Sequence, residues 1–152
     1  MRTKVSTYFE SKVRLEKINE EGMQVKFNEV YTIEACSFTD CEAKMNEYIS
    51  QYTQGEFNIL TEAYAKYKEI FFSDKEDETL WYKAQISFIT IDEKTEKQKK
   101  SKTVYLVQGK DIESAKKNID EVMSGSMVDY VIEGIHETTI QDIICDASKT
   151  QD

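Results

Sequence analysis

The sequence predicts an α+β protein made of two tandem ββαβ repeats, with antiparallel sheets and two main helices. Apolar residues recur at helical spacing in two segments, they alternate at strand spacing before and after each of these, and the whole series occurs twice. The stretch VYLVQGKDIESAKKNIDEVM, residues 104–123, follows the pattern of VYTIEACSFTDCEAKMNEYI, which begins 74 residues earlier. One helix and three strands cannot bury both of their faces, so we expect the repeats to pack on each other about a pseudo-twofold axis.

Each repeat opens with a strand, because apolar and polar residues alternate there with a period of two. At an offset of 73, four residues of the first repeat match four of the second: Phe9, Ser11, Val13 and Leu15 against Tyr82, Ala84, Ile86 and Phe88. A second alternation follows in residues 23–33 and again in residues 104–107. Two such runs joined by a polar turn predict a hairpin, with residues 19–22 turning the first and the lysine-rich segment turning the second.

A helix follows each hairpin. The apolar residues of both helices have the spacing i, i+3, i+7, i+10, i+11, which places them on one stripe: Phe38, Cys41, Met45, Tyr48 and Ile49 in the first, and Ile112, Ala115, Ile119, Val122 and Met123 in the second. Ser37 and Asp111 are the expected N-caps. Asp40, three residues after Ser37, predicts a capping box in the first helix only.

The last segment of each repeat is the hardest to assign. LTEAYAKYKEIFF, residues 60–72, is rich in helix-forming residues, whereas its partner EGIHETTIQDIIC, residues 133–145, has a glycine, two adjacent threonines and four isoleucines that disfavour a helix. A shared fold requires one answer for both, and the second copy permits only strand. We therefore expect one compact domain over 1–152, with units at 7–72 and 80–146 and a charged linker at 73–79.

Composition limits the functions that are open to the chain. It carries 29 acidic against 20 basic residues, a net charge of −9, and no apolar run approaches the length of a membrane span. The N-terminus lacks the apolar stretch of a secretory signal, so we expect a cytoplasmic protein with no membrane partner. Cys36, Cys41 and Cys145 with the single His136 do not make a zinc pattern, and we expect no metal and no cofactor.

Catalytic motifs are also scarce, and we expect a protein that is not an enzyme. Ser114 to Lys117 has the S-x-x-K spacing without companion motifs, and the five glycines form no phosphate loop. His136 is a candidate general base or ligand contact, although a partly buried histidine with one hydrogen bond is the more common case.

The polar side of each first strand carries the clearest candidates for ligand binding. It begins with an aromatic residue, Tyr8 or Trp81, and continues with long polar side chains. Such a face suits stacking against a base, and equally suits burial under a second layer. The candidate ligand-binding residues are Tyr8, Lys12, Arg14, Trp81, Tyr82, Lys83, Tyr105 and His136.

The second hairpin carries a cluster of positive charge. Residues 94–102 contain five lysines, opposed by Glu96 alone: Lys94, Lys97, Lys99, Lys100 and Lys102. These are the candidate contacts to phosphate or nucleic acid, with binding that weakens in salt. A solvated turn that prevents edge-to-edge pairing is the alternative, and attraction to the acidic tip of another subunit's first hairpin is a third.

The phrases LWYKAQISFITIDEKTEKQKKSKTVYLVQ, YFESKVRLEKINEEGMQVKFNEVYTIEACSFTDCEAKM and GEFNI resemble an uncharacterised domain family of gut Bacteroidetes and their tailed, crAss-like phages. The similarity runs from about Tyr8 to Ile144, and WYK and FITIDE are its most specific parts. The family brings no activity with it. The resemblance implies a small protein of the bacterial host cell, often encoded by phages, with a role in DNA metabolism, virion assembly or counter-defence.

Three functional hypotheses follow. The first is a non-catalytic counter-defence protein that sequesters a nucleotide-like signal, with Tyr8, Trp81 and Tyr82 stacking on it. The alternative is a protein that binds single-stranded nucleic acid or assists replication, and the third is a structural or assembly protein. Under all three we expect a homo-oligomer, because duplicated units leave sheet edges unpaired.

Overall fold

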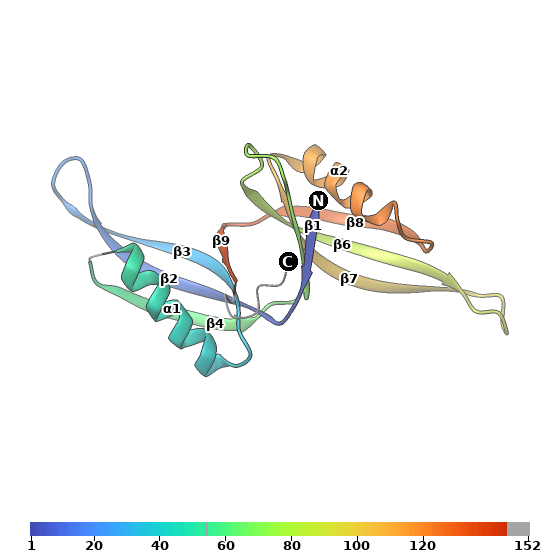
Figure 1. Ribbon diagram of the computed structural model, residues 1–152, viewed down its shortest axis with the longest axis horizontal. Coiled ribbons are helices and arrows are strands. Elements are labelled where there is room, and N and C mark those ends of the chain that lie inside the picture. The colour runs from blue at the N-terminus through green and yellow to red at the C-terminus, as the bar shows by residue number, and fades with distance from the viewer. Residues whose placement is uncertain (54, 146–152) are drawn as a thin grey trace. The chain divides into compact units, whose positions relative to one another are not determined.

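The computed structural model describes residues 1–53 and 55–145, and its mixed helices and sheets confirm the α+β class (Figure 1). The chain forms two compact units that are interleaved in sequence. Of the described residues, unit 1 contains Met1–Val5 with Lys66–Thr138, and unit 2 contains those of Ser6–Ala65 together with 139–145. The boundaries after Ala65 and Thr138 lie within the predicted repeats 7–72 and 80–146. Packing about a pseudo-twofold axis stays a prediction.

Unit 2 is a four-stranded sheet with one helix. In the order β4-β2-β3-β9, its elements are β4 (Phe57–Tyr64), β2 (Tyr8–Ile18), β3 (Gln24–Glu34), β9 (Ile140–Ile144) and α1 (Phe38–Tyr52). The predicted alternation places Phe9, Val13 and Leu15 of β2 under the helix, against Met45 and Ile49 of α1. The apolar stripe and the period-two strand thus form one core, as the sequence predicts.

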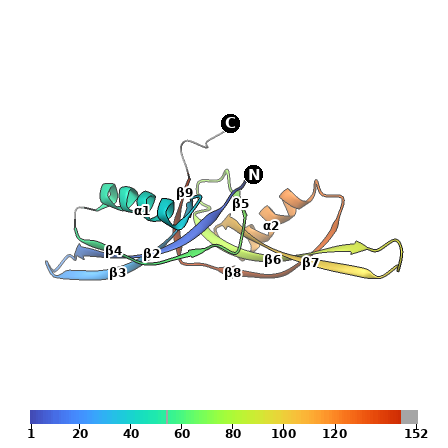
Figure 2. The same ribbon diagram turned by 90° about the horizontal axis from the view of Figure 1, so that it is seen from below.

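Unit 1 repeats this plan with one strand more. In the order β1-β5-β7-β6-β8, its elements are β1 (Arg2–Val5), β5 (Glu69–Phe72), β7 (Gln98–Gly109), β6 (Leu80–Ile91), β8 (Asp129–Glu137) and α2 (Ile112–Met123). Tyr82, Ala84 and Ile86 face the buried residues Ala115 and Ile119 of α2. In each unit the helix covers one face of the sheet, and the opposite face carries no helix (Figure 2).

The ends of the two repeats cross between the units. β4 pairs with β2 inside unit 2, but β5, which follows it, joins unit 1 in parallel with β7. Likewise β8 pairs with β6 in unit 1, whereas β9 joins unit 2 in parallel with β3. The prediction of strand in both segments is confirmed. The prediction of a single strand in each is wrong, because the chain leaves its sheet after Tyr64 and after Glu137.

The helix caps differ from the prediction in one respect. Ser37 and Asp111 are the N-caps, and the Ser37 hydroxyl accepts the N–H of Asp40 at 3.1 Å. The capping box, however, belongs to α2: Asp111 accepts the N–H of Ser114 at 2.7 Å, and Ser114 Oγ accepts the N–H of Asp111 at 3.0 Å. In α1 the Asp40 carboxylate accepts the N–H of Cys36 at 3.0 Å instead, so the predicted box is wrong there.

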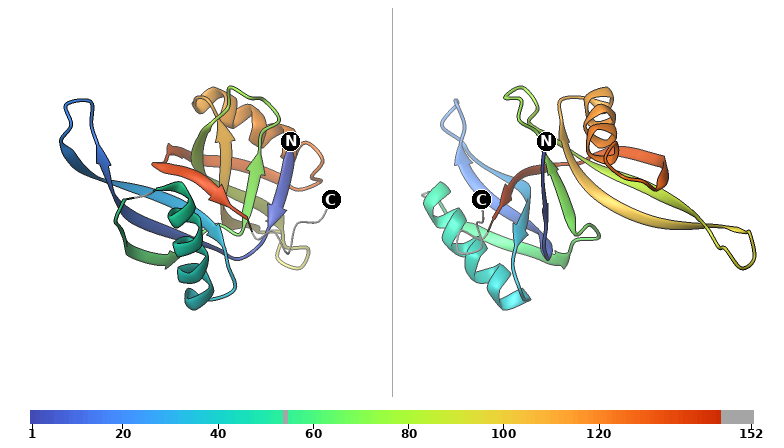
Figure 3. Two further views of the ribbon diagram at one scale, coloured as in Figure 1. Left: turned by 60° about the vertical axis from the view of Figure 1, so that its left-hand side comes forward. Right: turned by 45° about the vertical axis from the view of Figure 1, so that its right-hand side comes forward.

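The two hairpins turn with one residue in the left-handed backbone region. In the first hairpin this residue is Gly22 (φ 79). It lies in the turn that begins at Asn19, whose side-chain oxygen accepts hydrogen bonds from two backbone N–H groups. In the second it is Glu96 (φ 58), which carries the steric cost of a β-carbon there. The second turn spans residues 92–97, so Lys99, Lys100 and Lys102 lie in β7. The β6–β7 hairpin extends beyond α2 (Figure 3).

Candidate nucleic-acid interface

The sheet of unit 1 has one face under α2 and one face without a helix, which we call the open face. Directly opposed residues of antiparallel strands point to the same side, and side chains alternate along each strand. Because Tyr82, Ala84 and Ile86 lie under α2, the residues between them, Lys83 and Gln85, lie on the open face. Ser87 and Ile89 continue this row along β6.

Strand pairing brings several predicted candidates together on this face. Lys83 is paired with His136 of β8. Further along β6, Ser87 is paired with Lys102 and Ile89 with Lys100, both on β7. Four candidates that are far apart in the sequence, Lys83, His136, Lys100 and Lys102, therefore share one face. Lys83 differs from the other two lysines, because it is half-buried and its Nζ lies 5.8 Å from the centre of the buried Tyr67 ring.

The lysine-rich hairpin carries more charge than the open face alone. All five lysines from 94 to 102 are exposed, and none of them forms an ion pair with another described residue. Lys94 and Lys97 lie in the turn, beyond the end of β6. Lys99 is paired with Thr90, which places it on the side of the sheet that α2 covers. Lys100 and Lys102 are thus the lysines of β7 that the open face presents.

His136 lies on the exposed surface of β8 with its ring extended toward Gly134. A β-carbon at position 134 would lie 3.4 Å from His136 Nε2, so the glycine leaves the room that the ring occupies. Its cross-strand neighbour is the ammonium-bearing Lys83, and no serine or cysteine nucleophile is paired with it. This surrounding suits a hydrogen bond to a bound ligand better than general-base catalysis.

A buried hydroxyl lies beneath the open face. Ser87 is fully buried between its neighbours Lys102 and Val131, and its Oγ has no hydrogen-bond partner among the described residues. A buried hydroxyl without a partner costs free energy. A ligand on the open face can accept its hydrogen only after the neighbouring side chains that cover Ser87 move.

The predicted stacking rings are buried. By the alternation along β6, Trp81 lies on the open face, but that end of the face is covered, because Leu106, which is paired with Lys83, and Ile70, which is paired with Leu106, are buried as well. Tyr8, Trp81 and Tyr82 are 1%, 4% and 3% exposed. Trp81 packs edge-on against Phe72, with ring centres 5.7 Å apart. Tyr105 packs against the buried Phe71 under α2, where burial and the nearby Glu69 raise its pKa. A base can stack on these rings only after the residues that cover them move.

Lys12 and Arg14 lie on the corresponding face of unit 2. Both are exposed, and Arg14 Nε donates to Asn28 Oδ1 at 3.3 Å. Nearby on that face, Lys26 Nζ lies 3.6 Å from Glu16 Oε1. This face therefore mixes cations with an acid that neutralises one of them. The open face of unit 1 also carries an acid, because Asp129 and Lys100 are both paired with Ile89.

The described residues offer little for metal binding, and of the three free cysteines Cys36 and Cys145 are exposed while Cys41 is buried. Among them there is no group of three histidine, cysteine, aspartate or glutamate side chains arranged to hold a metal ion. Cys41 is buried, and burial together with the charge of Glu62 raises its pKa to about 12, which keeps the thiol protonated. None of the described helices is long and apolar enough to cross a membrane.

The comparisons with known proteins identify the family but not a function. A family model described as Domain of unknown function (DUF4494) matches residues 7–146. The chain belongs to this family. No curated protein matches this DUF4494 chain, and neither does any solved structure. The similarity noted in the sequence thus leads to an uncharacterised family, and the functional argument depends on the geometry described above.

Proposed function

We propose that this DUF4494 protein is a non-catalytic binding protein for single-stranded nucleic acid, which it holds on the open face of unit 1 and along the lysine hairpin. The observation that supports this is the alignment of Lys83, Lys100, Lys102 and His136 on one sheet face without a covering helix. A positive groove or face that follows the phosphate backbone is the common element of proteins that bind single strands.

The spacing and the charge both suit an extended polyanion. Lys100 and Lys102 are two residues apart on one strand, which separates them by about 7 Å. That repeat is similar to the distance between neighbouring phosphates in an extended single strand. Although the whole chain has a charge of −9, binding depends on the local potential, and residues 94–102 carry five positive charges against one negative.

The burial of the predicted stacking rings counts against the sequestration hypothesis. Sequestration of a nucleotide-like signal requires stacking on Tyr8, Trp81 or Tyr82, whose rings are almost fully buried. Without exposed rings, recognition rests on phosphates, and phosphate contacts carry no sequence information. We therefore expect binding that is independent of base sequence and sensitive to salt. A cytoplasmic, phage-related role and self-association belong to the same proposal.

A fluorescence polarisation titration with labelled oligo-dT tests the proposal. The informative variant is Lys100→Gln/Lys102→Gln, and the matched control is Lys116→Gln/Lys117→Gln, which removes the same charge from exposed positions on α2. We expect wild type and control to bind at low salt with similar affinity. The open-face variant should bind about tenfold more weakly, which corresponds to about 1.4 kcal/mol.

Two results would reject the proposal. One is an absence of binding to oligo-dT at 25 mM salt or below, taken as roughly the range where phosphate contacts are strongest. The other is an equal loss of affinity in both lysine variants, which would show that total charge matters and that the open face does not. Titration of the same samples with mononucleotides separates a strand binder from a nucleotide sequestrant.

A further inference from the structure

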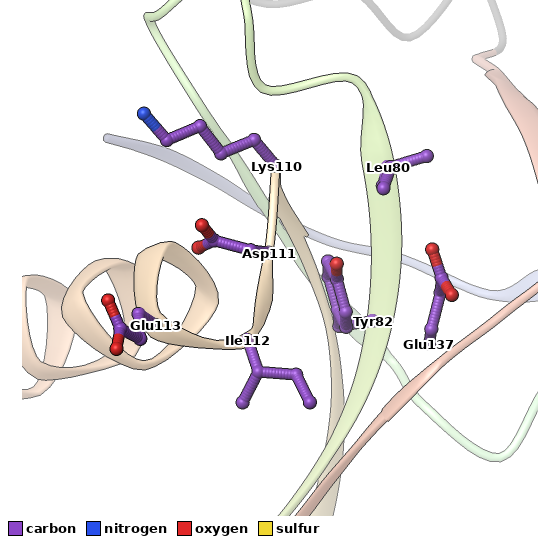
Figure 4. Close-up of a pocket in the computed structure, with 7 residues that line it drawn as sticks. All are labelled: Leu80, Tyr82, Lys110, Asp111, Ile112, Glu113 and Glu137. Atoms are coloured by element: carbon purple, nitrogen blue, oxygen red, sulfur yellow. The ribbon is translucent and has the colours of Figure 1, made fainter.

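A cavity of about 580 Å³ lies on the other side of the unit 1 sheet, where α2 begins. It is formed by the start of β6, the end of β8 and the first turn of α2, and its lining residues are Leu80, Tyr82, Lys110, Asp111, Ile112, Glu113 and Glu137. Figure 4 shows Tyr82 between Ile112 and Glu137. All of these residues belong to unit 1. The nucleic-acid interface uses none of them.

Unit 2 shows what the same position can hold. There the first helical residue is Phe38, the counterpart of Ile112, and the strand pair Phe9 and Tyr64 corresponds to Tyr82 and Glu137. The three rings of unit 2 contact one another, with centres 5.1 Å (Phe9 to Phe38), 4.5 Å (Phe9 to Tyr64) and 4.8 Å (Phe38 to Tyr64) apart. The fold thus accommodates aromatic rings at this corner. Unit 1 has the same corner without two of the rings.

The walls of the cavity leave apolar surface exposed. Leu80 is 39% exposed and Ile112 is 56% exposed, although each has apolar neighbours in the cavity. The Tyr82 ring beneath them is buried. An inserted aromatic ring would remove apolar surface of both partners from water, and ring pairs gain further stability at the spacings seen in unit 2.

The rim selects for positive charge. Asp111, Glu113 and Glu137 surround the cavity. Burial raises the pKa of Tyr82, and the negative charges of Glu137 and Asp111 add to that effect. The one cation, Lys110, points away from Tyr82 (Figure 4), and its Nζ lies 3.4 Å from Asp77 Oδ2.

An anion is the wrong ligand for this corner, even though a helix begins there. The N–H of Ser114 donates to Asp111, and the N–H groups of Lys110 and Asp111 donate to Ser114 Oγ at 2.8 Å and 3.0 Å. Three backbone N–H groups at this corner are therefore already used, and the carboxylates of Asp111, Glu113 and Glu137 oppose an anion there.

We propose that this cavity binds a peptide segment of a partner protein that presents an aromatic side chain next to a lysine or arginine. The ring would occupy the place that aromatic rings fill in unit 2, and the cation would meet the acidic rim. β8 is the last strand of its sheet, so an extended segment can run along its outer edge and bring the ring to the cavity. The peptide backbone then supplies hydrogen bonds that a small cationic aromatic molecule cannot.

The test is an NMR titration of the ¹⁵N-labelled protein with capped tripeptides. The probe is Lys-Phe-Lys, and the controls are Lys-Ala-Lys, which lacks the ring, Glu-Phe-Glu, which reverses the charge, and phenethylamine, which lacks the peptide. We expect Lys-Phe-Lys to shift the amide signals of Leu80, Ile112 and Glu113. Each control should bind at least about tenfold more weakly.

Two double variants then locate the site. Ile112→Phe/Glu137→Tyr installs the aromatic side chains of unit 2, so it should fold and lose Lys-Phe-Lys binding. Glu113→Gln/Glu137→Gln keeps the cavity and should weaken binding about tenfold, whereas the matched control Glu20→Gln/Glu21→Gln in the first hairpin turn should not. The proposal is overturned if Lys-Phe-Lys does not bind, if phenethylamine or Glu-Phe-Glu binds equally well, or if the filled variant binds like wild type.

Discussion

The contact between β7 and the start of α2 predicts that Gly109→Ala destabilises unit 1. A β-carbon at position 109 would lie 2.9 Å from Ser114 Oγ and 3.1 Å from Ala115 N, closer than real β-carbons normally approach other atoms. Neither neighbour can yield easily. Ser114 Oγ is held by two backbone N–H groups, and Ala115 is fully buried in the core.

The size of the effect follows from what must move. Because the clash involves the backbone of the first helical turn, relief requires displacement of α2 from the sheet. Overpacking of this kind costs about 1–3 kcal/mol. We expect a loss of about 2 kcal/mol in the free energy of unfolding, and a melting temperature lower by about 4–8 °C for a chain of this size.

Guanidinium unfolding followed by tryptophan fluorescence measures this directly, because Trp81 is the single tryptophan and lies buried in unit 1. The matched control is Gly125→Ala, the same change in the same unit at a position where a β-carbon meets no atom within 4 Å. It should be neutral or slightly stabilising. If Gly109→Ala unfolds at the same guanidinium concentration as Gly125→Ala, the close packing of β7 on α2 is wrong.

Three further predictions use other features of the chain. If Lys94, Lys97, Lys100 and Lys102 each neutralise one phosphate, a plot of the logarithm of the binding constant for oligo-dT against the logarithm of the salt concentration should have a slope of about −3. In Lys100→Gln/Lys102→Gln the slope should be only about −1.5. Equal slopes for the two proteins would contradict the interface. Glu96→Gly should raise the free energy of unfolding by about 1 kcal/mol, since it relieves the left-handed backbone at the hairpin turn, and a lower melting temperature would count against that origin. Burial, with a contribution from Glu42, raises the pKa of Glu62, whose Oε1 has no partner among the described residues. A carboxyl whose pKa is raised on folding favours the folded state below its unfolded-state pKa, and this contribution is lost as the pH rises through its folded-state pKa. Glu62→Gln should therefore increase the free energy of unfolding more at about pH 7.5 than at about pH 4, which lie roughly on either side of these two pKa values. An equal effect in denaturant titrations at both pH values would refute this.

Local periodicity was sufficient to predict most of the elements. The helical stripes from Phe38 and from Ile112 lie on α1 and α2, and the alternation from Phe9 and from Tyr82 lies on β2 and β6. These signals are strong because each element buries one face against its own neighbour in the chain. Comparing the two repeats also corrected the helical preference of residues 60–72, whose two ends lie in β4 and β5.

The long-range arrangement could not be predicted in the same way. β5 and β9 are short apolar strands that pair in parallel with strands far away in the sequence, and alternation alone does not choose a partner. β1, with the sequence RTKV, is too short and polar to give a strand signal. The pairing of Lys83 with His136 is hidden for the same reason, because it depends on the register between β6 and β8.

The candidate binding face, too, could be predicted only in part from the sequence. The sequence indicated the lysine cluster and the polar side of β6, and the structure describes which lysines the open face presents. The sequence did not predict that Tyr8 and Trp81 are buried, since an aromatic residue on the polar side of a strand fits an exposed surface and a covered one equally well. Gln85 and Ser87 were visible only as part of an alternation, and strand pairing gives them neighbours that bear on binding.

The most direct test of the account is an NMR map of the surface that oligo-dT contacts. The ¹⁵N-labelled protein is titrated with short oligo-dT at low salt, and the shifted signals are assigned to residues. The account predicts shifts at Lys83, Gln85, Lys100, Lys102 and His136, with α2 unaffected. Shifts confined to α2 or to unit 2, or no shifts at all, would contradict it.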